Sequence, residues 1–112
     1  MQAVIAWWDL PGTGQTVASL RESLRREGTD GWAAVAGLRL KLWISEPTGE
    51  RWGAVMVWDS AEAAEAAVSA GLPPNRAAEL IGRPPSLRLV LDVEAAVAGI
   101  AGEMTNEEWT WP

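Results

Sequence analysis

The alternation of apolar and polar side chains over residues 38–45 is the feature that most restricts the fold of this chain. Successive side chains of a β-strand point to opposite faces, so this pattern predicts a strand with one apolar face. A turn sequence, Glu-Pro-Thr-Gly-Glu, follows at residues 46–50, and residues 51–58 form a second apolar run. Two strands joined by so short a turn pair as a β-hairpin. The chain must therefore build an antiparallel sheet around this hairpin.

A strand and a helix precede the hairpin. Residues 2–8 are almost entirely apolar and lead into a Pro-Gly turn, which is typical of a strand. Val17, Leu20 and Leu24 then recur at helical spacing, so we expect an amphipathic helix over residues 15–27. A glycine follows directly, as it does at many helix ends.

Helices and a last strand follow the hairpin. Residues 59–62 (Asp-Ser-Ala-Glu) are of the types that cap helix N-termini, and they open an alanine-rich helix. We expect a short helix over 75–81, a strand over 86–93 and a helix over 94–101. The order predicts an α+β fold, a ferredoxin-like β-α-β-β-α-β domain with a four-stranded antiparallel sheet over residues 1–101. Residues 102–112 form an acidic, tryptophan-containing tail.

The two faces of this sheet should differ in what covers them. Right-handed crossovers place both main helices on one face, and we expect the leucines of strands 38–45 and 86–93 to lie beneath them. The opposite face would then carry Arg39, Lys41, Trp43, Arg88 and Asp92. A tryptophan among charges of both signs suits a second sheet better than water alone. We therefore expect a homodimer with these five residues in its interface.

The composition excludes several classes of function. The chain has no Cys, His, Tyr or Phe, eight Trp and a net charge of −6. Cys and His supply most transition-metal ligands, so we expect no metal and no other cofactor. A Ser-His-Asp or Cys-His relay is excluded. The acidic balance argues against nucleic acid and anionic membranes as partners. Residues 1–8 lack the basic start of a signal peptide, so we expect a cytoplasmic protein.

Several short segments carry a family resemblance. These are Ala-Gly-Leu at 36–38, Lys-Leu-Trp-Ile-Ser-Glu at 41–46, Gly-Ala-Val-Met-Val-Trp at 53–58 and Trp-x-Ser-x-Glu-Ala at 58–63. Together they resemble the antibiotic-biosynthesis monooxygenase superfamily, nearest to its YdhR-like branch. The resemblance implies a dimeric α+β barrel, in which two sheets pack face to face, and a pocket between the sheet and helices of each subunit. Known members oxidise electron-rich phenolic or polyketide substrates with dioxygen, without metal or flavin. The His and Tyr residues that some members use are absent here.

The candidate pocket residues are tryptophans and groups near the short third helix. Indole rings and N–H groups suit an aromatic, oxygen-bearing substrate, although the same residues can simply fill a core that lacks Phe and Tyr. The tryptophans in question are Trp8, Trp32, Trp52 and Trp58. Asn75, Arg76 and Arg83 flank the third helix, which is placed to cover the pocket; the alternative is a solvated loop capped by Asn75. No residue is singled out as catalytic.

Three functions remain open. The first is a cofactor-independent monooxygenase acting on an aromatic or polyketide-derived small molecule, whose own anion would reduce dioxygen. The second is a non-oxidative polyketide cyclase or isomerase, with Asp59, Asp92 or a glutamate transferring protons. The third is a non-catalytic module that binds small molecules.

Overall fold

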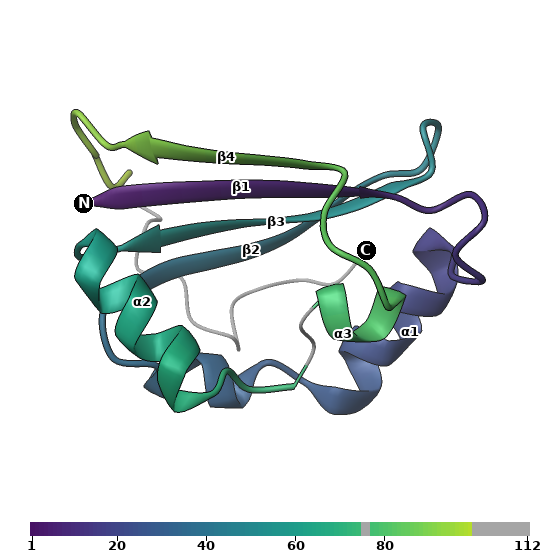
Figure 1. Cartoon of the computed structure of the whole chain (residues 1–112), viewed down its shortest axis with the longest axis horizontal. Coiled ribbons are helices and arrows are strands. Elements are labelled where there is room, and N and C mark those ends of the chain that lie inside the picture. The colour runs from purple at the N-terminus through teal and green to yellow at the C-terminus, as the bar shows by residue number, and fades with distance from the viewer. Residues whose placement is uncertain (75–76, 100–112) are drawn as a thin grey trace.

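In the computed structural model, which describes residues 1–74 and 77–99, a four-stranded antiparallel sheet carries helices along one side (Figure 1). The strands are β1 (Gln2–Asp9), β2 (Leu38–Glu46), β3 (Arg51–Trp58) and β4 (Leu87–Asp92). The helices are α1 (Val17–Glu27), the 3-10 helix η1 (Asp30–Ala34), α2 (Ala61–Ala70) and α3 (Ala77–Ile81). The spatial strand order β2-β3-β1-β4 confirms the ferredoxin-like prediction.

Helix α1 begins after a capping residue, ends at a glycine and buries an apolar stripe. The Thr16 hydroxyl accepts a hydrogen bond from Ser19 N at 3.0 Å, and the Ser19 hydroxyl accepts one from Thr16 N at 2.8 Å. This reciprocal pair is a capping box. Gly28, with φ 76°, ends the helix by donating to Leu24 O at 2.9 Å. Leu20 and Leu24 are buried, which confirms the predicted stripe.

The main core fills the space between the sheet and helices α1 and α3. Trp8 on β1 and Trp52 on β3 are register partners and supply its two largest side chains. The other buried members are Ala6, Leu10, Leu20, Leu24, Ala77 and Ile81. The Trp8 indole satisfies its polar end by donating from Nε1 to Arg83 O at 2.9 Å. This arrangement joins the loop before β4 to β1.

Strand β2 shows that the expected assignment of the sheet faces was wrong. Lys41 pairs in register with Met56, and Trp43 pairs with Ala54, which is buried on the helix side. Side chains of directly paired residues share a face. Lys41 and Trp43 therefore point toward the helices and not toward the expected interface. The leucines of β2 from position 40 onward point away from the helices.

Strand β4 is reversed in the same way. Arg88 pairs with Ala6, a core residue beneath the helices, and Asp92 pairs with Gln2 on the same side. Leu89 pairs with Ile5 on the other surface, so Arg88 and Asp92 also lie on the helix side. The surface turned away from the helices, called the open face below, is mainly apolar, with the charged residues Asp9, Glu46 and Arg51 at one end. Its apolar residues are Ala3, Ile5, Trp7, Leu40, Leu42, Ile44, Val55, Val57, Leu87, Leu89 and Leu91.

The physical reason for the reversal is the volume of tryptophan. Trp8, Trp52 and Trp58 occupy the helix side of the central strands and already provide its bulk. A β-bulge between Leu38 and Leu40 also breaks the alternation, since Arg39 is an extra residue there. Leu38 and Leu40 consequently do not share a face, contrary to expectation.

Two other expectations have different outcomes. Residues 94–99 form no helix, so the predicted helix over 94–101 is wrong for that part, and its last residues lie outside the described ranges. Asn75, Arg76 and the tail over 102–112 also lie outside them. In the described part of the chain, no helix combines the length and apolar character needed to cross a bilayer.

Candidate functional site

A pocket of about 320 Å³ lies between the first half of β2 and the segment that contains η1. Its volume falls at the lower end of the range for small-molecule sites. The lining mixes aromatic, aliphatic and basic side chains. The lining residues are Thr29, Trp32, Ala33, Leu38, Arg39, Leu40, Lys41 and Trp43.

Two tryptophans hold the Lys41 ammonium in this pocket. The Nζ atom lies 4.0 Å from the ring centroid of Trp32 and 5.0 Å from that of Trp43. The two indoles meet edge to face, with centroids 6.0 Å apart and planes at 86°. Both distances fall within cation–π range, so each ring contributes attraction to the charge. The three side chains form a compact unit, called the Trp–Lys–Trp cluster below.

Burial sets the ionisation of Lys41. Desolvation lowers the pKa of its ammonium from the ordinary 10.5 to about 8. Within residues 1–74 and 77–99, no carboxylate lies within ion-pair distance of Nζ. With this pKa the group is still mainly protonated at neutral pH. Among the described residues, its charge is stabilised by the faces of Trp32 and Trp43.

Trp32 is held in place by a contact distant in sequence. Its side chain is 4% exposed, and Nε1 donates to Pro74 O at 2.7 Å. The indole N–H is thus occupied and does not serve as a free donor to a substrate. What Trp32 offers the pocket is its ring face. The local sequence, a large residue in a loop of small ones, is consistent with this role.

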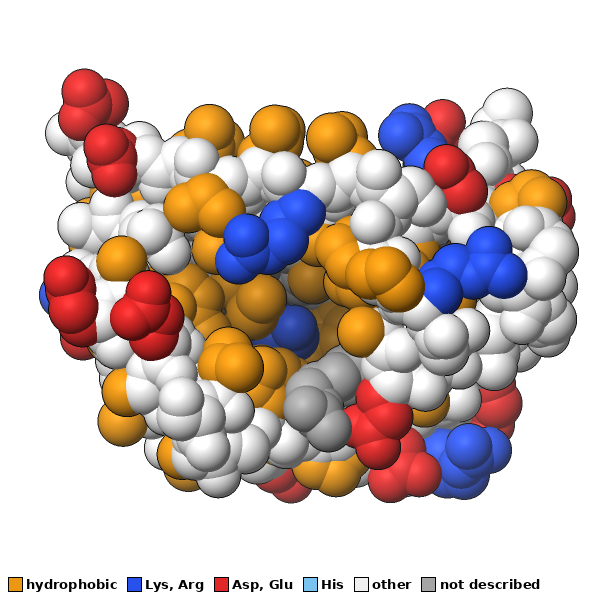
Figure 2. Space-filling view, in the orientation of Figure 1, with side chains coloured by type: hydrophobic (Ala, Val, Ile, Leu, Met, Phe, Trp, Pro, Cys, Tyr) orange, Lys and Arg blue, Asp and Glu red, His pale blue; other side chains and the backbone are white. Residues whose placement is uncertain are grey.

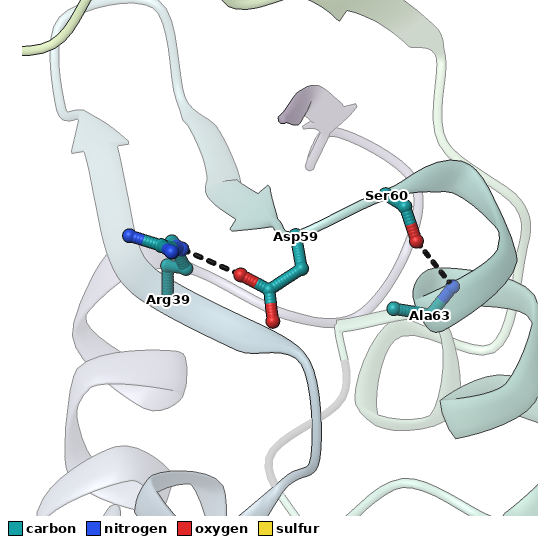
Figure 3. Close-up of polar contacts among 4 residues, drawn as sticks. All are labelled: Arg39, Asp59, Ser60 and Ala63. Atoms are coloured by element: carbon teal, nitrogen blue, oxygen red, sulfur yellow. Dashed lines mark hydrogen bonds and ion pairs between the residues drawn. The ribbon is translucent and has the colours of Figure 1, made fainter.

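The junction of β3 and α2 closes one end of this region (Figure 3). The Asp59 carboxylate accepts a hydrogen bond from Arg39 Nε at 2.5 Å. The Ser60 hydroxyl caps α2 by accepting from Ala63 N at 3.0 Å. Asp59, one candidate for proton transfer, is therefore exposed and already paired with a cation.

Gly37 allows this junction to approach β2 closely. Its carbonyl accepts a hydrogen bond from Asp59 N at 2.8 Å. With φ at +81°, it adopts a conformation that glycine tolerates best, and a Cβ there would lie 2.6 Å from the Cβ of Ala63. The strand that carries Lys41 is therefore anchored to α2 at its start.

The remaining predicted pocket residues are distributed elsewhere. Trp8 and Trp52 lie in the main core. Trp58, the last residue of β3, is 2% exposed, and its side chain lies on the helix side of the sheet. The Arg83 guanidinium is exposed and donates to Gly12 O at 3.2 Å. Of the residues predicted for the substrate pocket and lying within the described ranges, only Trp32 lines the pocket at β2. Arg39, Lys41 and Trp43, which were predicted for the dimer interface, line it as well.

Lys41 is the functional candidate that sequence reasoning placed on the wrong face. It was expected in a dimer interface together with Trp43. One available signal was that it is the single lysine of the chain and lies two residues from a tryptophan on the same strand face. In a chain without His or Cys, such a residue is the natural candidate for reactive chemistry.

The helix side of the sheet extends from this pocket as an apolar row. Lys41 pairs with Met56, Met56 with Val4, and Val4 with Val90, so these side chains cross the sheet from β2 to β4. Figure 2 shows a hollow between the sheet and the helices, walled mainly by hydrophobic side chains and with a basic group inside it. The arrangement suits a flat apolar body with a negatively charged end.

Comparisons with known proteins identify the fold. No family model matches the sequence, and no curated protein matches it significantly. A candidate antibiotic biosynthesis monooxygenase from Chloroflexus aurantiacus J-10-fl is similar in structure, with TM-score 0.58 and 22% identity over 88% of this chain and 97% of that one. A variant of SnoaB, a cofactor-independent oxygenase from Streptomyces nogalater, gives TM-score 0.61 and 14% identity with the same coverages, 88% and 97%.

A third solved structure, the protein YjcS, gives TM-score 0.58 and 8% identity over 83% of this chain and 98% of that one. In all three cases nearly the whole of the other chain is matched. The chain therefore has the α+β fold found in antibiotic-biosynthesis-monooxygenase-like structures.

Proposed function

We propose that this chain belongs to the antibiotic-biosynthesis monooxygenase superfamily and oxidises an aromatic or polyketide-derived small molecule without a cofactor. The observation that carries the proposal is the Trp–Lys–Trp cluster in a pocket of a fold shared with a cofactor-independent oxygenase. Assignment to the YdhR-like branch stays a prediction from the sequence segments quoted above.

The proposed reaction needs only the substrate and dioxygen. A carbon–hydrogen bond flanked by electron-rich rings loses its proton, and the resulting carbanion transfers one electron to dioxygen. The two radicals combine as a peroxide, which loses water to leave a ketone. One oxygen atom enters the product, the other leaves as water, and the substrate supplies all the electrons.

The pocket residues would act on charge and solvent. The Lys41 ammonium would stabilise the substrate anion, because a fixed positive charge in a poorly hydrated site interacts strongly with developing negative charge. Trp32 and Trp43 would contact the aromatic body and keep water from it. This assigns Lys41 an electrostatic role and leaves the identity of the proton acceptor open.

We also propose a homodimer formed through the open face. Leu40, Leu87, Leu89 and Leu91 are each more than two-fifths exposed there. Figure 2 shows hydrophobic side chains in a row along its upper edge, where β4 lies. A contiguous apolar surface of this kind is typical of an interface. The fold that the sequence resembles pairs two sheets in this way, so a second copy is the proposed partner.

Labelled dioxygen tests the proposed reaction. The full chain would be incubated with an anthrone under ¹⁸O₂, without flavin, metal or reductant, and the product analysed by mass spectrometry. We expect one labelled oxygen in the ketone, with at least a tenfold lower rate for Lys41→Met, since one charge-assisted contact is worth at least about that factor. Ser69→Ala, on the exposed side of α2, is the matched control.

Other outcomes separate the competing functions. A rearranged product of unchanged mass that forms equally well without air would replace the monooxygenase by a cyclase or isomerase. Binding without turnover across a broad set of phenolic and polyketide-like compounds would favour a non-catalytic binding module.

A further inference from the structure

We propose that the pocket at β2 selects ligands that already carry an acidic oxygen, such as an aromatic carboxylate or an ionised phenol, by pairing that oxygen with Lys41. The inference deepens the proposed function and rests on it only for the aromatic nature of the ligand. It assigns a chemical class to the bound molecule before any reaction occurs.

The first argument is the missing counterion. A buried charge is costly unless an opposite charge or several hydrogen bonds compensate it. In the described ranges, the Lys41 ammonium makes no ion pair, and its charge lies against the rings of Trp32 and Trp43. An anion that reaches Nζ would compensate the solvation that the ammonium loses on burial, and the described residues offer no carboxylate in that place.

The second argument is the arrangement of charges around the pocket. On β2 and β3 the other ionic groups already pair, Arg39 with Asp59 and Arg51 with Glu46. The packed segment η1 contributes Asp30, which is exposed. The pocket lining itself contains two basic residues and no acidic one. Of the two basic residues in the lining, Arg39 is neutralised by Asp59, so an incoming anion would meet the uncompensated charge of Lys41.

The third argument is the shape of the apolar surroundings. The two indoles stand nearly perpendicular, at 86°, so a flat ring can lie against one face while meeting the edge of the other. Met56 adjoins Lys41 in register and continues the apolar surface. A pocket of about 320 Å³ accommodates a fused bicyclic ring. A cationic ligand would be repelled, and a neutral one would leave the ammonium uncompensated.

The test compares an acid with its neutral analogue of similar shape. Binding of 2-naphthoate and of 2-naphthamide to the full chain would be measured by calorimetry and by quenching of tryptophan fluorescence at pH 7. We expect the acid to bind about tenfold more tightly or better, the factor that one charge-assisted contact supplies. Lys41→Met should abolish the difference, and Lys41→Arg should retain much of it.

Dependence on pH gives an independent readout. The acid's advantage should be nearly constant between about pH 6 and 7, where the carboxylate is ionised and Lys41 is protonated. It should decline as the pH rises through 8 and Lys41 loses its proton. The amide's affinity should not change over the same range. Equal binding of acid and amide, or full affinity for the acid in Lys41→Met, would overturn the inference and leave the cluster a structural stack.

A second pair of ligands identifies the source of the negative charge. A nitronaphthol ionised at pH 7 would be compared with its methyl ether. Preference for the naphthol alone assigns a phenolate ligand, and preference for the naphthoate alone assigns a carboxylate. These measurements need no dioxygen, so the acid preference can hold while turnover fails. Turnover of neutral anthrones without any acid preference would instead retain the reaction and refute this inference.

Discussion

Replacing Lys41 by Met should stabilise the protein at neutral pH and remove most of its pH dependence at alkaline pH. The chain offers an unusually clean test, because Lys41 is its single lysine and it has no Cys, Tyr or His. Arginine titrates above pH 12, and an N-terminal amine has an ordinary pKa near 8. Between about pH 8.5 and 10.5, a change in stability therefore reports on Lys41.

The sign follows from the two protonation states. The pKa of Lys41 is about 8 in the folded chain against an ordinary 10.5, so the unfolded chain binds more protons between these values. The free energy of unfolding should thus rise as pH increases from 8 to 10.5. Below about pH 7 both states are protonated, and the buried charge lowers the free energy of unfolding by its full amount.

The magnitude is set by two opposing effects. A tenfold change in an ionisation constant is worth about 1.4 kcal/mol, so the lowered pKa corresponds to about 3 kcal/mol of desolvation cost. The cation–π contacts of the cluster return about 1–2 kcal/mol to the charged form. The desolvation cost of the charge is still larger than the stabilisation from the two rings. We expect a net rise in stability of about 1–3 kcal/mol in the natural chain, and a similar gain from Lys41→Met at pH 7.

Urea unfolding followed by tryptophan fluorescence measures the effect. The natural chain, Lys41→Met and Lys41→Arg would be unfolded at pH 7, 8.5, 9.5 and 10.5, at one protein concentration because association shifts the midpoint. Lys41→Arg is the control that stays charged at every pH and should show no rise. A natural chain whose stability is flat across this range, or a Lys41→Met variant that is less stable at pH 7, would refute the reasoning.

Three further outcomes are expected. Leu89→Glu should shift the protein from dimer to monomer in light scattering at micromolar concentration, because Leu89 is 42% exposed on the open face. Ser69→Glu on α2 should leave the dimer intact, and dimers in both variants would refute the proposed interface. Gly37→Ala should lower the free energy of unfolding by about 1–3 kcal/mol, since it combines a left-handed φ with a Cβ 2.6 Å from that of Ala63; an unchanged urea midpoint would contradict this. Trp8→Phe should cost about 1–2 kcal/mol through loss of the 2.9 Å hydrogen bond to the loop before β4, and melting temperatures equal to the natural chain's would show that this bond contributes nothing.

Local sequence signals were enough to predict the four strands, helices α1, α2 and α3, and their order. Alternation over β2, the turn at 46–50 and the caps before α1 and α2 are local signals, because each depends on residues within about four positions of one another. Ser60 caps α2 and Gly28 ends α1 as those signals indicate. Once the order β-α-β-β-α-β is known, few topologies remain, and the ferredoxin-like sheet is one of them.

Which face of the sheet the helices cover, and therefore where the pocket lies, depends on packing between distant segments. A period of two defines two faces but does not say which one is buried, since that depends on side-chain volume contributed by other strands. Here Trp8, Trp52 and Trp58 fill the helix side. The open face receives Leu40 and Leu42 of β2 and the leucines of β4. Lys41 consequently enters the pocket beside Trp32, whose own position depends on Pro74, 42 residues away in the chain. Contacts at that separation carry no local pattern, so the packing that creates the site could not be read from the sequence.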